Sequence, residues 1–499
     1  MNELRSPIEA AQWLRSRVTG TLQCDSRKVR AGDGFIAWPG AATDGRSHVN
    51  TALVQGAAAC VVEKEGVAPY NFEGDAIATY LQLKPACGPI AAAYFGEPTN
   101  ELDVLAVTGT NGKTSTAWWL AQALSNVQPA PIPCALIGTL GTGRPPNVEF
   151  NGLTTPDPVL MQRQFRKFVD EGVKACAIEA SSVGIVERRM DGSRIRVAIF
   201  TNFTQDHLDY HGTMEAYWQA KAELFSWPGL KAAVVNIDDV KGLQLVAAIG
   251  NSLDVWTVSC ERPARLAARE IGYEIGDDSG GLKFMVCEGA QQHALSTQLI
   301  GQYNVSNLLG VIGAMRAMGV SLEAAVQACG TLTAVPGRME RLAEAGKPVV
   351  AIDSAHTPDA LDKALLALKP MAQQRGGQLW CVFGCGGDRD PIKRPLMAAV
   401  AEKNADRVVV TSDNPRSEKP ETVISQILLG LSHNECVQVQ GDRALAIAET
   451  IRSADRNDVV LVAGKGHEDY QEIAGVKHPF SDMAHAQAAL AGWTARSAA

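Results

Sequence analysis

The segment 109–115, which reads GTNGKTS, contains the residue types that bind phosphate groups. It follows the apolar run 104–107 and precedes a stretch of helical character, 114–124. A glycine-rich turn between strand and helix lets backbone N–H groups point at phosphate oxygens, and the helix N-terminus adds positive potential. We therefore predict a phosphate-binding loop, with the Lys113 ammonium on the β- and γ-phosphates and the Thr114 hydroxyl on Mg²⁺. The loop consists of Gly109, Thr110, Asn111, Gly112, Lys113, Thr114 and Ser115.

The match to the usual phosphate-loop pattern is incomplete. That pattern has a glycine where this chain has Val107. A tight turn without a ligand is the alternative interpretation. The strand before the segment and the helix after it favour phosphate binding.

Three further side chains are candidate partners of the loop. Glu179 and His207 each follow an apolar run, and Lys221 lies in the helical stretch 216–225. A divalent cation at the loop needs ligands in addition to Thr114, which Glu179 and His207 could supply. Taken singly, each has a structural alternative: a solvated carboxylate, a buried histidine with satisfied hydrogen bonds, and a surface lysine.

The last third of the chain has charged residues at the ends of three apolar runs. They lie in GGDRD (386–390), DNPRSE (413–418) and GKGHED (464–469). Arg389 and Arg416 could each bind a carboxylate with two hydrogen bonds, and Glu468 could hold an ammonium group. Opposite charges on neighbouring loops favour a zwitterionic ligand such as an amino acid. A network of surface salt bridges is the alternative.

These loops need a scaffold that brings them together. The apolar runs before them lack alternation, which is typical of parallel strands buried on both faces. Ligands of such sheets bind outside the carboxyl ends of the strands. We therefore expect one site shared by two α/β blocks. The predicted strands begin the segments 104–114, 175–182, 197–207 and 232–239 of the middle block and 348–359, 379–390, 407–418 and 459–469 of the last.

Composition limits the class of protein. The chain has 499 residues, with 46 Lys and Arg against 54 Asp and Glu, which gives a net charge of −8. This balance argues against a dedicated nucleic-acid binder. No apolar run reaches the ~18 residues of a membrane helix, and the 11 cysteines lack zinc-like pairing. We expect a cytoplasmic protein, most simply a monomer, without membrane insertion. Turn-rich segments at 95–103 and 332–341 predict domains at 1–97, 98–334 and 335–499.

Eleven motifs in order resemble those of the Mur ligase family over essentially the whole chain. The resemblance implies an α/β fold of three domains: a smaller N-terminal α/β domain, a central P-loop ATPase-type parallel-sheet domain and a C-terminal Rossmann-like α/β domain. The motifs are CDSRKVRAGDGF (24–35), TGTNGKTS (108–115), TTPDP (154–158), EASS (179–182), NFTQDHLDYHG (202–212), GQYNVSN (301–307), PGRME (336–340), DSAHTPDAL (353–361), GGDRDPIKRP (386–395), SDNPRSE (412–418) and AGKGHED (463–469).

The resemblance also implies an activity. ATP would phosphorylate the terminal carboxylate of UDP-N-acetylmuramoyl-L-alanyl-D-glutamate, and the amine of meso-2,6-diaminopimelate would attack the resulting acyl phosphate in peptidoglycan synthesis. A related ligase that adds L-lysine is the main alternative, which Arg416 disfavours because lysine has no distal carboxylate. A folate-extending ligase and a P-loop small-molecule kinase or nucleotide switch are the others.

Site roles follow from the resemblance by position. Lys113, His207 and Lys221 are the expected catalytic residues, and Thr114, Glu179, His207 and a CO₂-carbamylated Lys221 the expected ligands of two Mg²⁺ ions. Expected ATP contacts besides the loop are Asn304, Asn307, Arg338 and Asp353. Expected UDP-sugar-peptide contacts are Ser26, Thr154, Thr155, Ser182 and Arg188 or Arg189. The expected diaminopimelate pocket comprises Arg389, Asp413, Asn414, Pro415, Arg416, Gly464 and Glu468.

The chain departs from the family pattern at two positions. It has Ser354 where the family commonly has tyrosine, and Val183 where it often has histidine. The first change removes a flat surface near the nucleotide. The second removes a polar contact to the sugar-peptide.

Overall fold

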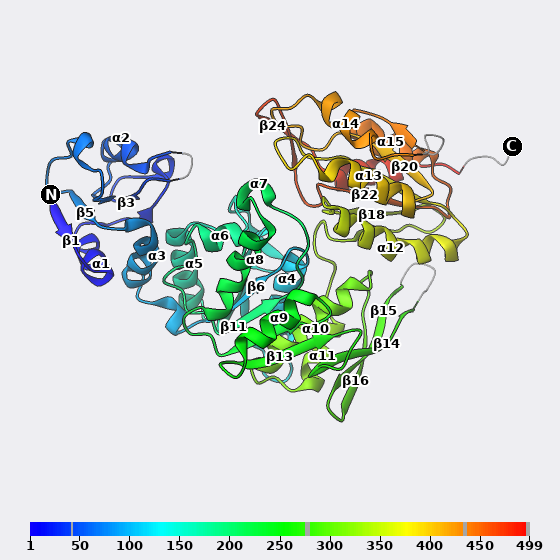
Figure 1. Ribbon diagram of the computed structural model, residues 1–499, viewed down its shortest axis with the longest axis horizontal. Helices are drawn as coiled ribbons and strands as arrows, with labels where there is room; N and C mark the ends of the chain where they lie inside the picture. Colours follow the sequence, from blue (N-terminus) through cyan, green and yellow to red (C-terminus); the bar gives the residue numbers. More distant parts are fainter. Residues whose placement is uncertain (41–42, 275–279, 433–436, 496–499) are drawn as a thin grey trace.

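The structure, a computed structural model, describes residues 1–40, 43–274, 280–432 and 437–495. Figure 1 shows three units in chain order, each built around its own sheet, with the first unit at one end of the molecule. The described residues include no helix that is both long and apolar enough to cross a membrane.

The first unit is a small parallel sheet with helices. Its strand order is β1-β5-β4-β3-β2, and every pairing is parallel. The N-terminal α/β unit expected from the family resemblance is therefore present. Its elements are β1 (Asn2–Leu4), α1 (Pro7–Arg15), β2 (Leu22–Gln23), β3 (Gly34–Ala37), α2 (Val49–Val54), β4 (Ala59–Glu63), β5 (Ile77–Tyr80) and α3 (Leu83–Tyr94).

The central unit contains an eleven-stranded sheet of order β16-β15-β14-β13-β12-β11-β6-β10-β7-β8-β9. The seven strands from β14 to β7 in this order run parallel to one another. Its strands are β6 (Asp103–Thr108), β7 (Cys134–Gly138), β8 (Gly141–Arg144), β9 (Asn147–Glu149), β10 (Ala175–Glu179), β11 (Val197–Phe200), β12 (Ala232–Asn236), β13 (Asp254–Ser259), β14 (Leu266–Glu274), β15 (Gly281–Glu288) and β16 (Gln291–Ser296). The four strands predicted for the middle block are confirmed as β6, β10, β11 and β12.

Both edges of the central sheet are antiparallel, which the prediction of a parallel sheet did not include. The hairpin β7–β8–β9 closes one edge, and β14–β15–β16 extends the other. Antiparallel strands need only short turns between them, so they leave none of the strand–loop–helix spacing from which the parallel strands were predicted.

The helices of the central unit follow strands of both kinds, parallel and antiparallel. They are α4 (Lys113–Asn126), α5 (Pro158–Asp170), α6 (Ser182–Val186), α7 (Leu208–His211), α8 (Met214–Ala222), α9 (Val240–Ile249), α10 (Tyr303–Ala317) and α11 (Leu322–Gly330). The helical stretch predicted at 216–225 is α8, which ends at Ala222 and continues as a 3₁₀ turn over Glu223–Ser226.

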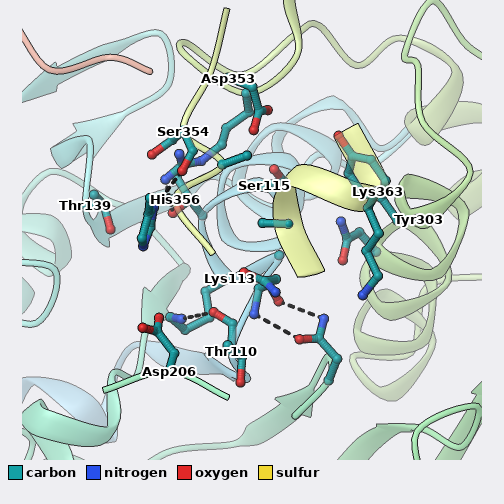
Figure 2. A pocket seen from close by; sticks show the side chains of 18 of the residues that line it. Thr110, Lys113, Ser115, Thr139, Asp206, Tyr303, Asp353, Ser354, His356 and Lys363 are labelled. Atoms are coloured by element: carbon teal, nitrogen blue, oxygen red, sulfur yellow. Dashed lines mark hydrogen bonds between the residues drawn. The ribbon is translucent and has the colours of Figure 1, made fainter. Parts of the chain in front are cut away.

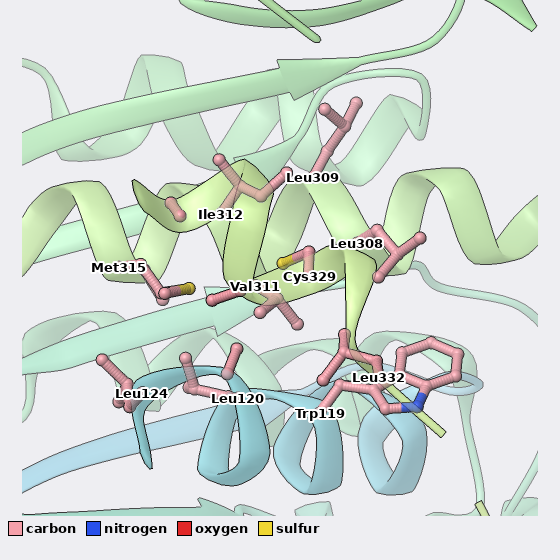
Figure 3. Packing of buried hydrophobic residues seen from close by; sticks show 14 of the residues in the cluster. Trp119, Leu120, Leu124, Leu308, Leu309, Val311, Ile312, Met315, Cys329 and Leu332 are labelled. Atoms are coloured by element: carbon pink, nitrogen blue, oxygen red, sulfur yellow. The ribbon is translucent and has the colours of Figure 1, made fainter. Parts of the chain in front are cut away.

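The core of the central unit holds the phosphate loop in place. Helix α4, which starts at that loop, packs on α10 and α11 through apolar side chains (Figure 3). The Trp119 indole N–H also donates to the Thr333 carbonyl at 2.9 Å. Because α4 is fixed along its length, the N–H groups at its start have a fixed direction. The labelled packing residues are Trp119, Leu120, Leu124, Leu308, Leu309, Val311, Ile312, Met315, Cys329 and Leu332.

The third unit is a six-stranded sheet of order β17-β18-β22-β19-β20-β21, parallel except for the edge strand β17. The four strands predicted for the last block are confirmed as β18, β19, β20 and β22. A separate hairpin, β23–β24, follows. The elements are β17 (Glu340–Leu342), β18 (Val349–Asp353), α12 (Pro358–Arg375), β19 (Leu379–Phe383), α13 (Lys393–Asn404), β20 (Arg407–Val410), α14 (Pro420–Leu428), β21 (Val437–Val439), α15 (Arg443–Ser453), β22 (Val459–Ala463), β23 (Tyr470–Ile473), β24 (Val476–Pro479) and α16 (Asp482–Ala491).

Candidate functional site

A cavity of about 1340 Å³ lies between the central and third units. The loops that follow β6, β10 and β11 line one side, and those that follow β18, β19, β20 and β22 line the other. Figure 2 shows Thr110, Lys113 and Asp206 facing Asp353, Ser354 and His356. Two sheets thus present the carboxyl ends of their parallel strands to one space, as the sequence predicted.

The phosphate loop closes tightly on its surroundings. Gly112 caps the N-terminus of α4 with φ 85°, a conformation that favours glycine. A Cβ at this position would lie 2.4 Å from Asn307 Oδ1. Glycine therefore permits both the turn and the close approach of α10. The residues from Thr110 to Ser115 line the cavity, whereas Gly109 does not.

Lys113 is held by its own loop. Its ammonium donates to the carbonyls of Gly109 and Thr110 at 2.8 and 2.9 Å. Burial lowers the pKa of this ammonium, and the nearby carboxylate of Glu179 partly opposes the shift. The loop thus carries a fixed cation in the position expected to meet phosphate oxygens.

Oxygen ligands gather behind the loop. The Thr114 hydroxyl donates to Glu179 Oε2 at 2.9 Å, and Glu179, only 1% exposed, also accepts from the Thr139 backbone N–H at 2.7 Å. Gly138 makes room for this carboxylate, since a Cβ there would lie 2.4 Å from Glu179 Oε1. A hydroxyl beside a buried carboxylate is a set of hard oxygen donors suited to Mg²⁺.

Lys221 is a buried lysine at the base of the same loop. Its side chain is 1% exposed, and its Nζ donates to the Gly109 carbonyl at 2.8 Å. Burial and the neighbouring Lys113 lower the pKa of Lys221 well below its ordinary value, which Asp206 only partly offsets. No carboxylate hydrogen-bonds this ammonium among the described contacts. An amine in such a place is easily held neutral.

His207 and Asp206 lie in the loop between β11 and α7. Burial lowers the pKa of His207 to about 4, although Asp206 opposes the shift. Burial would raise the pKa of Asp206, but the neighbouring side chains of His356, His207 and Lys393 outweigh this effect and hold the pKa at about 2. The site therefore pairs a neutral imidazole with a charged carboxylate. The described residues contain no group of three or more His, Cys, Asp and Glu side chains able to hold a metal.

The residues expected to contact the nucleotide meet at the cavity. Asn304, Asn307, Arg338 and Asp353 all line it. Arg338 comes from the third unit, and its Nη2 donates to the Thr114 hydroxyl at 3.3 Å. Asp353 Oδ2 accepts from the Met339 backbone N–H at 2.8 Å, which fixes the segment that carries Arg338. This arginine thus connects the third unit to the phosphate loop.

The structure divides the expected sugar-peptide residues. Thr154, Thr155, Ser182 and Arg189 line the cavity, whereas Ser26 and Arg188 do not. Arg188 is paired with Asp191 at 2.8 Å and with Glu223 at 2.7 Å. Of the two arginines left open by the sequence, Arg189 faces the cavity. Val183 and Ser354, the two departures from the family pattern, line it as well.

The charged loops of the third unit form a second cluster in the cavity. The Asn414 amide donates to Glu468 Oε2 at 2.8 Å, and the buried ammonium of Lys465 donates to both side chains. Arg416, at φ 51°, donates from Nη1 to the Gly387 carbonyl at 2.6 Å. Arg389, Asp413, Asn414, Arg416, Gly464 and Glu468 line the cavity, and Pro415 does not.

One ion pair crosses the cavity. Arg389 Nη1 lies 3.2 Å from Asp209 Oδ2, and the Arg389 side chain is 52% exposed. Asn111 likewise donates to Asp359 Oδ2 at 3.0 Å. These two contacts hold the central and third units against each other beside the loop.

Several lining residues were missed from the sequence. Asp206, His356, Lys393 and His467 lie within motifs quoted above, but no role was assigned to them. Thr139 directly follows the apolar strand β7, so the rule that ligands collect at strand ends could have found it. The ten described cysteines are free, and most are buried.

Comparison with known proteins gives three family matches along the chain. They are the "Mur ligase family, catalytic domain" over residues 20–94, the "Mur ligase middle domain" over 107–315 and the "Mur ligase, glutamate ligase domain" over 337–466. Together these matches cover parts of all three sheet-containing units.

Two curated relatives are both named UDP-N-acetylmuramoyl-L-alanyl-D-glutamate–2,6-diaminopimelate ligase. The protein from Acidovorax sp. (strain JS42) is 62% identical over 98% of each chain. The protein from Pseudomonas aeruginosa (strain PAO1) is 44% identical over 95% of each chain.

Solved structures of Mur ligases resemble this chain as well. One described as the structure of the same ligase matches with TM-score 0.64 and 33% identity over 94% of each chain. A MurF ligase from Thermotoga maritima, solved with ADP, has TM-score 0.64 at 18% identity over 90% of this chain and 94% of that one, which shows the shared fold. With three family matches in order and relatives at this identity along nearly the whole chain, this protein belongs to the Mur ligase family.

Proposed function

We propose that this protein is an ATP-dependent amide ligase that adds meso-2,6-diaminopimelate to UDP-N-acetylmuramoyl-L-alanyl-D-glutamate in peptidoglycan synthesis. The observation that carries the proposal is the single cavity between two units. It places a phosphate-binding loop opposite a cluster of Arg416, Asn414 and Glu468, whose charges suit a zwitterion. The names of the relatives fit this reaction.

The first step would be phosphorylation of the terminal carboxylate of the UDP-sugar-dipeptide. A carboxylate oxygen attacks the γ-phosphorus, ADP leaves, and an acyl phosphate results. Two anions must approach, so fixed positive charge is needed where they meet. Lys113, held by two loop carbonyls, and Arg338, which reaches Thr114 from the other unit, would supply it.

The residues behind the loop fit Mg²⁺. Thr114 and Glu179 would hold one ion, and His207 with a carbamylated Lys221 a second. Such ions would neutralise phosphate charge and polarise the γ-phosphoryl group. The fit rests on the donor chemistry: a hydroxyl against a buried carboxylate, and an imidazole held neutral.

Carbamylation of Lys221 would resolve an otherwise unfavourable arrangement. The Lys221 Nζ is a buried amine near the Lys113 ammonium, and it contacts the Gly109 carbonyl and the Tyr217 ring, 4.4 Å from the ring centre. Reaction of the neutral amine with CO₂ forms an N–C bond and releases a proton, which converts the position into an anionic oxygen ligand. The lysine position could then coordinate a metal ion, which an ammonium group would repel.

The second step would be attack of the diaminopimelate amine on the acyl phosphate. The amine nitrogen bonds to the carbonyl carbon, the C–O bond to phosphate breaks, and inorganic phosphate leaves with one former carboxylate oxygen. Arg416 would bind the distal carboxylate of the amino acid, and Glu468 an ammonium group. Lysine lacks that carboxylate, so its binding would leave the guanidinium desolvated without a partner.

The UDP-sugar would extend from this cavity toward the first unit. Ser182 and Arg189 would contact its peptide end, and Ser26 of the first unit would lie farther along it. The division at 1–97, 98–334 and 335–499 then assigns the UDP-sugar, ATP and the amino acid to successive domains. We propose that the enzyme acts in the cytoplasm, where its nucleotide substrates occur.

An amino-acid panel tests the proposal. Purified protein with ATP, Mg²⁺ and the UDP-dipeptide is assayed for ADP release with meso-diaminopimelate, L-lysine, L-ornithine or D-glutamate. We expect turnover that requires both the UDP-dipeptide and meso-diaminopimelate. Equal turnover with L-lysine would contradict the specificity, and a stable phosphorylated product without an acceptor would indicate a kinase instead.

A further inference from the structure

A fully buried ion pair lies behind the two loops of the amino-acid pocket. The side chains of Arg443, at the start of α15, and Asp482, at the start of α16, are both 0% exposed. The pair is bidentate, with Arg443 Nε donating to Asp482 Oδ1 at 2.8 Å and Nη2 donating to Oδ2 at 2.7 Å. Neither residue lines the cavity, so neither can touch a substrate there.

The remaining donors of the guanidinium reach the two loops. Arg443 Nη1 donates to the Ser412 carbonyl at 3.2 Å, and Nη2 donates to the Ala463 carbonyl at 2.9 Å. Ala463 ends β22, and Ser412 lies two residues after the end of β20. Their successors, Asp413 with Asn414 and Gly464, line the cavity. One planar group thus ties together the points where the two loops leave the sheet.

The loops pack closely at this junction. A Cβ at Gly464 would lie 2.4 Å from Asp413 Oδ2 and 3.9 Å from Arg443 Nη2. Asn414, which follows in the first loop, is in turn hydrogen-bonded to Glu468 of the second. A small shift of either carbonyl would therefore separate the groups proposed to bind the amino acid.

The surrounding charges keep the guanidinium ionised. Burial would lower the pKa of Arg443, but Asp482, Asp413 and Glu468 outweigh this effect and raise it. Asp482 supplies the only buried carboxylate that is bonded directly to the guanidinium among the described contacts. Removing that carboxylate would leave a buried cation free to reorient toward Asp413, inside the pocket.

We infer that the Arg443–Asp482 pair is a positioning device for amino-acid recognition, through which the C-terminal helix α16 sets the spacing between the 412–416 and 464–468 loops. This inference rests on the proposed function and adds two residues to it. Residues that orient metal ligands from behind typically change metal affinity or activity by about 10- to 100-fold when altered, and we expect an effect of this order here.

The test compares Asp482→Asn with a control at the other end of the same sheet. Asp458 is 4% exposed and accepts from the Trp380 indole at 2.9 Å, next to the start of β22, far along the strand from Ala463. Asp458→Asn therefore removes a buried carboxylate without touching the loops. Wild-type turnover with meso-diaminopimelate is measured first, and its absence would refute the proposed function rather than this inference.

For Asp482→Asn we expect the KM for meso-diaminopimelate to rise about tenfold, with the KM for ATP and for the UDP-dipeptide within about twofold of wild type. Asp458→Asn should leave all three KM values within about twofold of wild type. We expect this even if its melting temperature falls as far as that of Asp482→Asn. Thermal shifts give a second readout: at one fixed concentration, meso-diaminopimelate should stabilise Asp482→Asn less than wild type, whereas ADP should stabilise both equally.

If Asp482→Asn fails to fold, Arg443→Lys tests the positioning role of the Arg443–Asp482 pair. A lysine keeps the cation, but its single nitrogen cannot reach Asp482 and both carbonyls in the same geometry. The diaminopimelate KM should rise as for Asp482→Asn. A KM equal to that of wild type in either folded variant, or equal rises for all three substrates, would overturn the inference.

Discussion

Replacing Arg416 by alanine should weaken diaminopimelate recognition far more than it weakens the fold. Arg416 Nη1 already donates to the Gly387 carbonyl, and its Nε lies 3.9 Å from Glu472 Oε2. The outer edge of the guanidinium therefore remains for a ligand carboxylate. With a side chain 23% exposed, the position is largely shielded from water before any substrate arrives.

The magnitude follows from that geometry. Hydrogen bonds to charged groups contribute about 1.5–3 kcal/mol each, and the partial exposure of Arg416 favours the lower end of that range. Two such bonds to one carboxylate therefore amount to about 3 kcal/mol. At about 1.4 kcal/mol per factor of ten, the KM for meso-diaminopimelate should rise about 100-fold.

The assay is ADP release at saturating ATP and UDP-dipeptide, with diaminopimelate varied. The control is Arg407→Ala, which removes a half-buried arginine at the start of β20, the strand whose other end leads to Arg416. That variant should keep its KM within about twofold of wild type, since Arg407 does not line the cavity. An unchanged KM in Arg416→Ala would refute the carboxylate clamp.

Three further predictions concern the loop and the pH response. Lys113→Met should lower kcat by about 10²- to 10³-fold while ADP still stabilises the protein in a thermal-shift assay; near-normal kcat would contradict its role in phosphoryl transfer. Gly112→Ala should weaken ADP binding in calorimetry, because its Cβ would meet Asn307 Oδ1 at 2.4 Å and the residue has φ 85°; wild-type affinity would show that the loop relaxes freely. Burial lowers the pKa of His467 from 6.5 to about 4, so between these values the unfolded chain binds a proton that the folded chain does not. The free energy of unfolding should therefore fall as the pH drops through this window, and it should fall less in His467→Gln. Urea titrations at pH 7 and pH 5 measure this fall. A fall of the same size in wild type and in His467→Gln would contradict the prediction.

The strands could be predicted because their chemistry is local. Continuous apolar runs that end in glycine or charge mark buried parallel strands, and β6, β10, β18 and β22 each follow that pattern. The hairpins β8–β9 and β15–β16 have no such signal. These strands are short or alternate between buried and exposed residues, and only their pairing at the edge of the sheet defines them.

The same distinction between local sequence signals and contacts made only in the fold applies to the residues of the site. Lys113 and Arg416 could be placed at the cavity because they lie in segments that follow β6 and β20, within motifs that have a chemical rationale. The choice between Arg188 and Arg189 could not be made, since it depends on Asp191 and on Glu223, which approaches Arg188 only in the fold. The pairing of Arg443 with Asp482 is equally hidden, because 39 residues separate the two in the chain.

The most direct test of the account follows oxygen atoms from substrate to products. The UDP-dipeptide is prepared with ¹⁸O in its terminal carboxylate and incubated with the protein, ATP, Mg²⁺ and meso-diaminopimelate, and the products are analysed by mass spectrometry. The account predicts a UDP product heavier by diaminopimelate less water, and inorganic phosphate that carries one ¹⁸O from the carboxylate. Unlabelled phosphate, or an amide formed without ADP, would contradict the acyl phosphate route and the role assigned to the cavity.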